Sequence, residues 1–92
     1  MTYLISYDLN SHGNDYTRFY KALSHLGAEK ILMSRWILKH PKDDIEGLRD
    51  YLWKFMDKKD RLLITTIDKS KFAYQNLMMD IEFFMELENS KN

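Results

Sequence analysis

Asp8 is the first residue whose chemistry needs an explanation, because it ends an apolar, aromatic stretch that begins at Tyr3. Aspartate is disfavoured in strands, and a buried charge is costly unless it is paired or bound to a metal. Asp8 is therefore either a solvated strand-end residue that caps the next loop or part of a site. One carboxylate alone would hold Mg²⁺ or Mn²⁺ weakly, since these ions prefer an octahedral set of oxygens. Two copies of Asp8 in a homodimer could share one ion.

Two further side chains are candidates for catalysis. His12 follows Asp8 in the polar loop 10–14. It could act as a general acid or base, because the reference pKa of histidine lies near neutrality; the alternative is a surface histidine without a role. Ser34 has no histidine or acid beside it in the sequence, so a nucleophilic triad is not indicated. Its hydroxyl could still orient a water or a phosphate.

The sequence also contains a local basic strip that could bind nucleic acid. Lys30, Arg35 and Lys39 stand within one short stretch that contains a single acid, Glu29. The strip is either a ridge that contacts phosphates or an ordinary solvated edge that discourages aggregation. Along a strand these three side chains do not all point the same way. Trp36, inside the strip, is either a core or interface residue or a platform for a base.

Composition limits the remaining possibilities. The chain has 92 residues, which suffice for one domain. Its 14 basic and 14 acidic residues give no net charge, which argues against strong nonspecific binding of nucleic acid. It has no cysteine, so disulfides and thiolate metal sites are excluded. No apolar run is long enough to span a bilayer. We therefore expect a cytoplasmic protein with no membrane partner.

The elements that must position these residues can be read from periodicity. Apolar spacing of i, i+3, i+4 and i+7 predicts two helices, and β-branched or aliphatic runs predict the strands between them. In chain order we expect a strand, a helix, a strand pair bent near Ser34, a helix and a strand, over residues 3–9, 16–26, 29–40, 45–55 and 61–67. This order predicts an α+β domain over residues 1–68, a ferredoxin-like βαββαβ fold with an antiparallel sheet. Helices then cover one face of the sheet, and another element or a second chain covers the other.

The tail, residues 69–92, carries two apolar stripes at helical spacing. We expect a C-terminal helix from Ser70 to Glu88, and two stripes exceed what packing on one surface needs. The helix either lies between its own sheet and a neighbouring subunit or docks another protein through adaptable methionines. The residues expected at this dimer or partner contact are Met78, Met79, Phe83 and Phe84.

Four stretches, taken in order, carry a resemblance to a known family. They are the strand 3–9 with its Tyr-Asp pair, the helix 16–27 with its closing glycine, the block 29–36 with a basic residue, an isoleucine, a serine and an aromatic, and the strand 60–64. The chain resembles the small CRISPR-associated endoribonucleases, whose members pair with the integrase during spacer acquisition. It is also similar to the related virulence-associated protein D toxins.

The resemblance implies a homodimer that pairs sheet to sheet, with a metal-dependent phosphodiesterase site in the dimer cleft. Asp8 would take the metal-binding role, and Lys30, Ser34 and Trp36 would stand at functional positions. The loop 10–14 lacks the arginines common in CRISPR members, and the tail pattern is helical where the family often has a strand. These departures indicate a divergent branch, toxin-like or borne by a phage or plasmid.

Two functions follow as hypotheses. The first is a divergent nuclease-like protein that uses Mg²⁺ or Mn²⁺ at a homodimer cleft to cleave RNA or DNA phosphodiesters. The second is a non-catalytic dimeric interaction module with a regulatory or inhibitory role. The zero net charge, the loop without arginines and the apolar tail favour the second.

Overall fold

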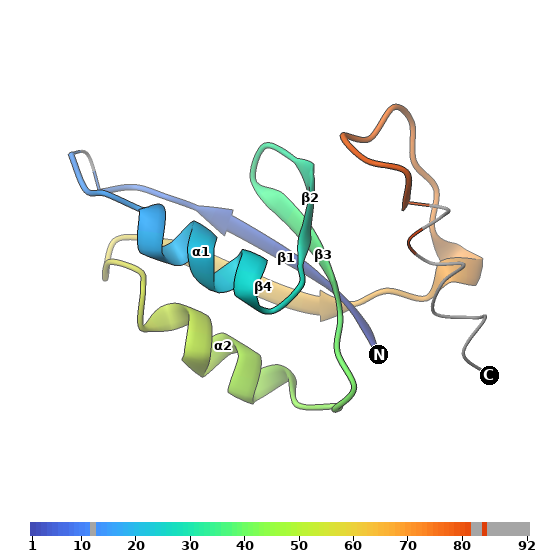
Figure 1. Cartoon of the computed structure of the whole chain (residues 1–92), viewed down its shortest axis with the longest axis horizontal. Helices are drawn as coiled ribbons and strands as arrows, with labels where there is room; N and C mark the ends of the chain where they lie inside the picture. The colour runs from blue at the N-terminus through green and yellow to red at the C-terminus, as the bar shows by residue number, and fades with distance from the viewer. Residues whose placement is uncertain (12, 82–83, 85–92) are drawn as a thin grey trace.

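The computed structural model describes residues 1–11, 13–81 and 84. It has the expected alternation of strands and helices (Figure 1). The elements are β1 (Thr2–Asp8), α1 (Thr17–His25), β2 (Glu29–Leu32), β3 (Arg35–Lys39), α2 (Ile45–Trp53), β4 (Arg61–Thr66) and a short 3-10 turn, Lys69–Lys71.

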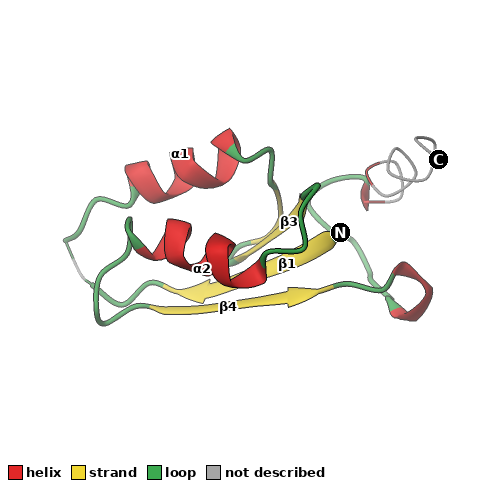
Figure 2. Ribbon diagram, turned by 90° about the horizontal axis from the view of Figure 1, so that it is seen from below, coloured by secondary structure: helices red, strands yellow, loops and turns green. Residues whose placement is uncertain are grey.

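The strands form one four-stranded sheet in the order β2-β3-β1-β4, and each neighbouring pair is antiparallel. Both helices lie on the same face of this sheet (Figure 2). The result is a small α+β architecture that is compatible with a ferredoxin-like fold. Strand β1 occupies the inside of the sheet, between β3 and β4, so the end of β1 is bordered by both neighbours.

Local chemistry accounts for the start of α2 and the end of α1, whereas the N-cap residue of α1, Tyr16, makes no side-chain capping bond. The Asp44 carboxylate accepts a hydrogen bond from the Gly47 N–H at 3.0 Å and so caps α2. Before α1, Asp15 accepts from the Thr17 N–H at 2.9 Å. Gly27 closes α1 with φ of +88°, a left-handed conformation that glycine adopts without steric cost.

Alternation along β1 separates the two faces of the sheet. Tyr3, Ile5 and Tyr7 are buried against the helices, where they pack with core residues such as Phe19 and Leu52. The intervening side chains of β1 lie on the opposite face, away from α1 and α2. Asp8 lies on that second face.

The tail covers only part of this second face, and it does so without the expected helix. From 72 to 80 the chain has no helical residue, and Asn76 has φ of +57°, so the helix predicted from Ser70 to Glu88 is wrong for this stretch. The Met78 N–H instead donates to the Ile31 carbonyl of β2 at 3.0 Å. Ser70 and Lys71 belong to the 3-10 turn, and helical backbone is found at Ile81 and Phe84. The other residues of the predicted helix lie outside the described residues.

Tertiary packing explains this difference from the prediction. Ile81 is 1% exposed and packs with Ile31 and Ile37 on the face away from the helices. Four apolar residues of the two predicted stripes pack against this cluster: Phe72, Leu77, Met79 and Phe84. Packing overrode the weak preference of the segment for helix. Figure 1 shows the tail, in orange and red, at the end of the sheet where the chain begins.

None of the helices formed by the described residues has the length and apolar character that crossing a bilayer requires.

Candidate functional site

The sheet face away from α1 and α2 carries a group of polar residues at the end of β1. In the sheet register Asp8 stands opposite Arg61 of β4, and Ser6 stands opposite Arg35 of β3 and Leu63 of β4. Residues directly opposite each other in a sheet share a face. The two arginines therefore flank β1 from either side, on the same face as Asp8 and Ser6.

These residues border a hollow of about 440 Å³. Its lining is Ser6, Tyr7, Asp8, Ser34, Arg35, Arg61, Leu62 and Leu63. Three predicted site residues meet here although they come from different segments: Asp8 from β1, Ser34 from the β2–β3 turn and Arg35 from β3. The structure thus gathers a carboxylate, two guanidinium groups and hydroxyls around one space, which we call the Asp8 hollow.

Asp8 itself is exposed and paired with a cation. Its Oδ2 lies 3.7 Å from Nη1 of Arg61, and the two side chains are 65% and 76% exposed. An ion pair between such exposed groups contributes at most about 1 kcal/mol to stability. In the single chain Asp8 is therefore a solvated residue at the end of its strand. Because its ion pair with Arg61 is weak, breaking that pair to bind a ligand would cost little free energy.

The residues of one chain do not fit a divalent metal ion. Asp8 is the only carboxylate among the residues that line the hollow, and a guanidinium lies beside it. Across residues 1–11, 13–81 and 84, no cluster of three or more histidine, aspartate or glutamate side chains could hold an ion. Since Mg²⁺ and Mn²⁺ prefer several oxygen ligands, a single chain offers too few.

Ser34 is held at the rim of the hollow by the backbone. Its carbonyl accepts a hydrogen bond from the Tyr7 N–H at 3.2 Å, which continues the β1–β3 ladder into the turn. The side chains of Ser34 and Arg35 are both exposed. They are available to a ligand in the hollow without rearrangement of the sheet.

Trp36 lies on the other side of the sheet from the hollow. It is 8% exposed, and its Nε1–H donates to the Tyr7 hydroxyl at 2.9 Å. The Tyr20 ring is stacked on it at a centroid distance of 6.4 Å. Burial raises the pKa of Tyr7, and the hydrogen bond from Trp36 opposes this shift. Trp36 is thus a core residue, and a base-stacking role does not fit this position.

The predicted basic strip does not form one surface. Lys30 stands opposite Trp36 in the sheet register and so lies toward the helix side of the edge strand. Arg35 and Lys39 lie on the opposite face, but they are four positions apart along the strand, a separation of about 13 Å. The Lys39 Nζ lies 4.8 Å from the centroid of the Phe84 ring, beside the tail. Of the three cations, only Arg35 reaches the Asp8 hollow.

The residues predicted for a dimer or partner contact divide into two groups. Met79 and Phe84 pack on the sheet of their own chain, against the Ile31 and Ile37 cluster. Met78 is 57% exposed. His12 and Phe83 lie outside the described residues.

Sequence reasoning missed Arg61 and Asp60. Arg61 begins the last strand, and only the strand order reveals that it borders Asp8. Asp60 is 5% exposed and accepts hydrogen bonds from the Asn10 N–H, the Tyr16 hydroxyl and the Asp57 N–H, at 2.7, 2.6 and 2.7 Å. Its place in a charged turn made it look like a surface residue.

The pKa of Asp60 reflects these bonds. Burial by itself raises the pKa, but the hydrogen bonds from Tyr16 and the two backbone N–H groups outweigh it, so the pKa lies below its ordinary value. Asp60 is therefore an ionised anchor that ties the loop after β1 to the start of β4, next to the hollow.

No family model matches this chain. The chemistry gathered at the Asp8 hollow is therefore the basis on which we infer a function.

Proposed function

We propose that this protein is a divergent nuclease-like protein that engages RNA or DNA phosphodiesters at the Asp8 hollow. The observation that supports this most is the convergence of Asp8, Ser34 and Arg35 on one hollow, with Arg61 beside them. Guanidinium groups bind phosphate oxygens through paired N–H donors, and a serine hydroxyl adds a further donor. Asp8 supplies the carboxylate that hydrolysis requires, as a base toward water or as a metal ligand.

A ferredoxin-like fold is part of the proposal. The order β2-β3-β1-β4 supports it, as do the antiparallel neighbours and the helix that follows each of β1 and β3. In this arrangement the sheet face that carries Asp8 is open to a second chain. The described part of the tail covers the Ile31 and Ile37 end of that face and leaves the Asp8 end uncovered.

The proposal therefore extends to a homodimer in which two Asp8 ends face each other. One chain offers a single carboxylate, so Mg²⁺ or Mn²⁺ becomes the expected cofactor only when a second Asp8 joins the first. When bound, the metal would supply a Lewis acid for the phosphodiester. Arg35, Arg61 and Ser34 would position the phosphate from either chain.

The Asp8→Asn variant tests this function. We expect cleavage of labelled RNA or DNA in the presence of Mg²⁺ or Mn²⁺ to fall by about a hundredfold or more, because the variant removes the only carboxylate of the hollow. Stability should change by less than about 1 kcal/mol, since the ion pair to Arg61 is exposed. Gel-based cleavage assays and urea unfolding measure the two quantities.

Asp50→Asn is the matched control. Asp50 is also an exposed aspartate paired with an arginine, Arg49, at 2.9 Å, but it lies on α2 away from the hollow. It should leave cleavage unchanged. Undiminished cleavage by Asp8→Asn, or an equal decrease in both variants, would remove Asp8 from the mechanism.

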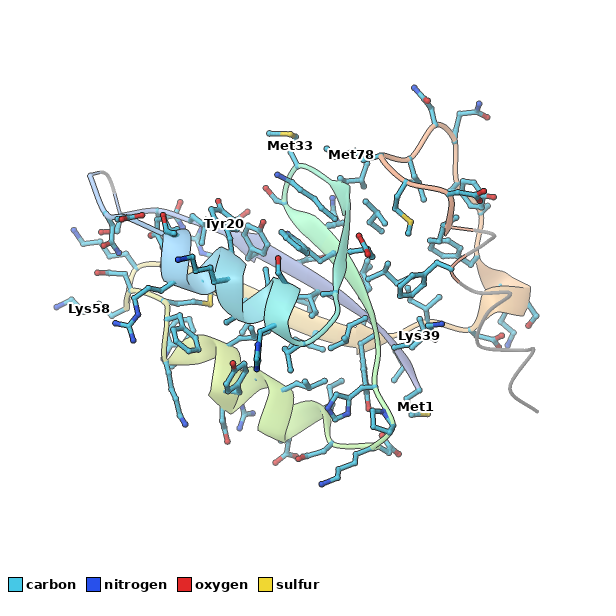
Figure 3. All side chains as sticks on the ribbon, in the orientation of Figure 1. Met1, Tyr20, Met33, Lys39, Lys58 and Met78 are labelled. Atoms are coloured by element: carbon cyan, nitrogen blue, oxygen red, sulfur yellow. The ribbon has the colours of Figure 1, made fainter. Side chains whose placement is uncertain are left out.

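A non-catalytic interaction module is the second candidate, and exposed apolar side chains favour it. Met33 and Met78 are 74% and 57% exposed. The Met78 N–H bonds to Ile31, two residues before Met33, and Figure 3 shows both methionines on the same side of the molecule. Exposed methionines suit adaptable protein contacts.

The double variant Met33→Ser/Met78→Ser tests this second candidate. It should abolish self-association or partner binding in sedimentation experiments and leave unfolding unchanged. The wild-type protein should then show no metal-dependent cleavage at micromolar concentration. Cleavage that depends on Asp8 would decide in favour of the nuclease-like function.

A further inference from the structure

A second hollow lies between α1 and α2, on helices that cover the face of the sheet away from Asp8. Its volume is about 290 Å³, near the lower end of the range for small-ligand pockets. It is lined by Arg18, Lys21, Ala22, His25, Tyr51 and Phe55. This helix groove therefore combines cations with aromatic rings, and no acid lines it.

The basic side chains of the groove come from one stripe of α1. Arg18, Lys21 and His25 occupy positions i, i+3 and i+7, which lie on one side of a helix. All three side chains are exposed. At 1.5 Å per residue the stripe extends about 10 Å along the helix axis. Its length suits a ligand with one or two anionic groups.

Arg18 and Lys21 form no salt bridge within the part of the chain that the structure describes. Asp15, before α1, is influenced by the charge of Lys21: hydrogen bonds from Thr17 chiefly lower its pKa, and Lys21 lowers it further. The groove thus presents positive charge to the solvent.

The aromatic wall belongs to α2 and the turn that follows it. Tyr51 and Phe55 pack edge to face with their ring centroids 5.4 Å apart, and both are partly exposed. The Arg18 guanidinium carbon lies 5.7 Å from the centroid of the Phe55 ring. This cation–π contact holds the guanidinium at the groove. A planar ligand would therefore meet ring surface and positive charge together.

We propose that the helix groove binds a nucleoside phosphate, with the phosphate on Arg18 and Lys21 and the base against Tyr51. Phosphate oxygens match the cations, and every base offers a π face for stacking. An acidic peptide would use the cations but leave the rings without a role. The ligand is either a free nucleotide or one unit of a single strand. The groove is separate from the Asp8 hollow, and its role goes beyond the proposed cleavage.

Binding of two probes to the full chain tests this site: adenosine monophosphate, and a labelled single-stranded oligoadenylate of about ten nucleotides. In Arg18→Gln/Lys21→Gln, the slope of log affinity for the oligonucleotide against log salt should become shallower by about 0.7, because the variant no longer neutralises the phosphate that the two cations bind together. The control Lys42→Gln/Lys71→Gln removes the same charge from exposed positions outside both hollows. It should leave the slope unchanged.

Tyr51→Leu tests base stacking separately from charge. We expect binding to weaken about tenfold, with an unchanged circular dichroism spectrum because leucine still packs against the core. If adenosine monophosphate binds with the same dependence on Arg18, Lys21 and Tyr51, the ligand is a free nucleotide. If only the oligonucleotide binds with this dependence, the ligand is a single-stranded nucleic acid.

Three results would overturn the site. In the first, Arg35→Gln/Arg61→Gln abolishes all nucleotide binding while Arg18→Gln/Lys21→Gln binds normally. This result would assign the binding to the Asp8 hollow. The second is an equal effect of the Lys42/Lys71 control. The third is binding of polyglutamate with no binding of either nucleotide probe. Failure of Asp8→Asn to affect cleavage leaves this proposal standing, because it concerns the other hollow.

Discussion

Asp60 has an environment that its place in the sequence does not indicate. It sits in a run of charged residues, yet it is buried and accepts three hydrogen bonds that join the loop after β1, the residue before α1 and the turn before β4. These bonds lie directly beside the strand ends that carry Asp8 and Arg61. Asp60 therefore positions the Asp8 hollow without lining it.

Replacing Asp60 with asparagine should destabilise the protein by about 1–3 kcal/mol. The amide has only one acceptor oxygen, so a buried N–H or hydroxyl donor is left without its partner. Urea unfolding at neutral pH measures the destabilisation. The control Asp57→Asn changes an acid of the same turn that is less buried and should cost less.

The same carboxylate makes stability depend on pH. The folded-state pKa of Asp60 is below its unfolded value, so its stabilising contribution is fully present above the unfolded pKa, near 4, and is lost as the pH falls through the folded pKa. Wild-type protein should therefore lose more stability between neutral pH and about pH 2 than Asp60→Asn does. Parallel pH-dependent unfolding curves would contradict this.

At the level of elements, the tail is a strap over one end of the sheet. Ile81 is buried between this segment and the sheet, while Met78, three residues earlier, is exposed. The segment thus packs on the sheet of its own chain, as one of the two alternatives for the tail expected, although its described part is mostly not helical.

Ile81→Ala should destabilise the protein by about 2–4 kcal/mol, because it removes a buried aliphatic side chain and leaves a cavity. Met78→Ala, on the exposed side of the same segment, should change stability by no more than about 0.5 kcal/mol. Thermal or urea unfolding compares the two. Equal effects would show that the tail does not pack on the sheet in solution.

At the scale of the whole molecule, the two faces of the sheet have different tasks in our proposals. The helix side buries Trp36 and presents the helix groove, whereas the other side carries the Asp8 hollow and the strap. The free Asp8 end of that face is where a second chain would have to approach.

A subunit-mixing experiment tests whether catalysis needs Asp8 from both chains. Equal amounts of wild type and Asp8→Asn, allowed to exchange subunits, yield about a quarter wild-type homodimers. If each site needs two Asp8 carboxylates, activity per total protein should fall to about a quarter of the wild-type value. A fall to only one half would show that each chain works alone.

The sequence by itself determined the features that depend on local periodicity. Alternation in residues 3–8 places Asp8 on the face opposite Tyr7, and apolar spacing predicted both helices, the first of which Gly27 closes. These features follow from backbone geometry that repeats every two or 3.6 residues. The sequence also suggested the candidate roles of Ser34 and Arg35, but it did not show that these residues lie beside Asp8.

Only the tertiary structure decided which distant residues meet. The strand order sets Arg61 against Asp8, the closing of the β1 loop buries Asp60, and the sheet register turns Trp36 and Lys30 away from Arg35. The tail shows the same principle, because packing against Ile31 and Ile37 outweighs a helical pattern. Contacts between residues far apart in sequence depend on how strands pair and pack, and local residue patterns do not encode that pairing.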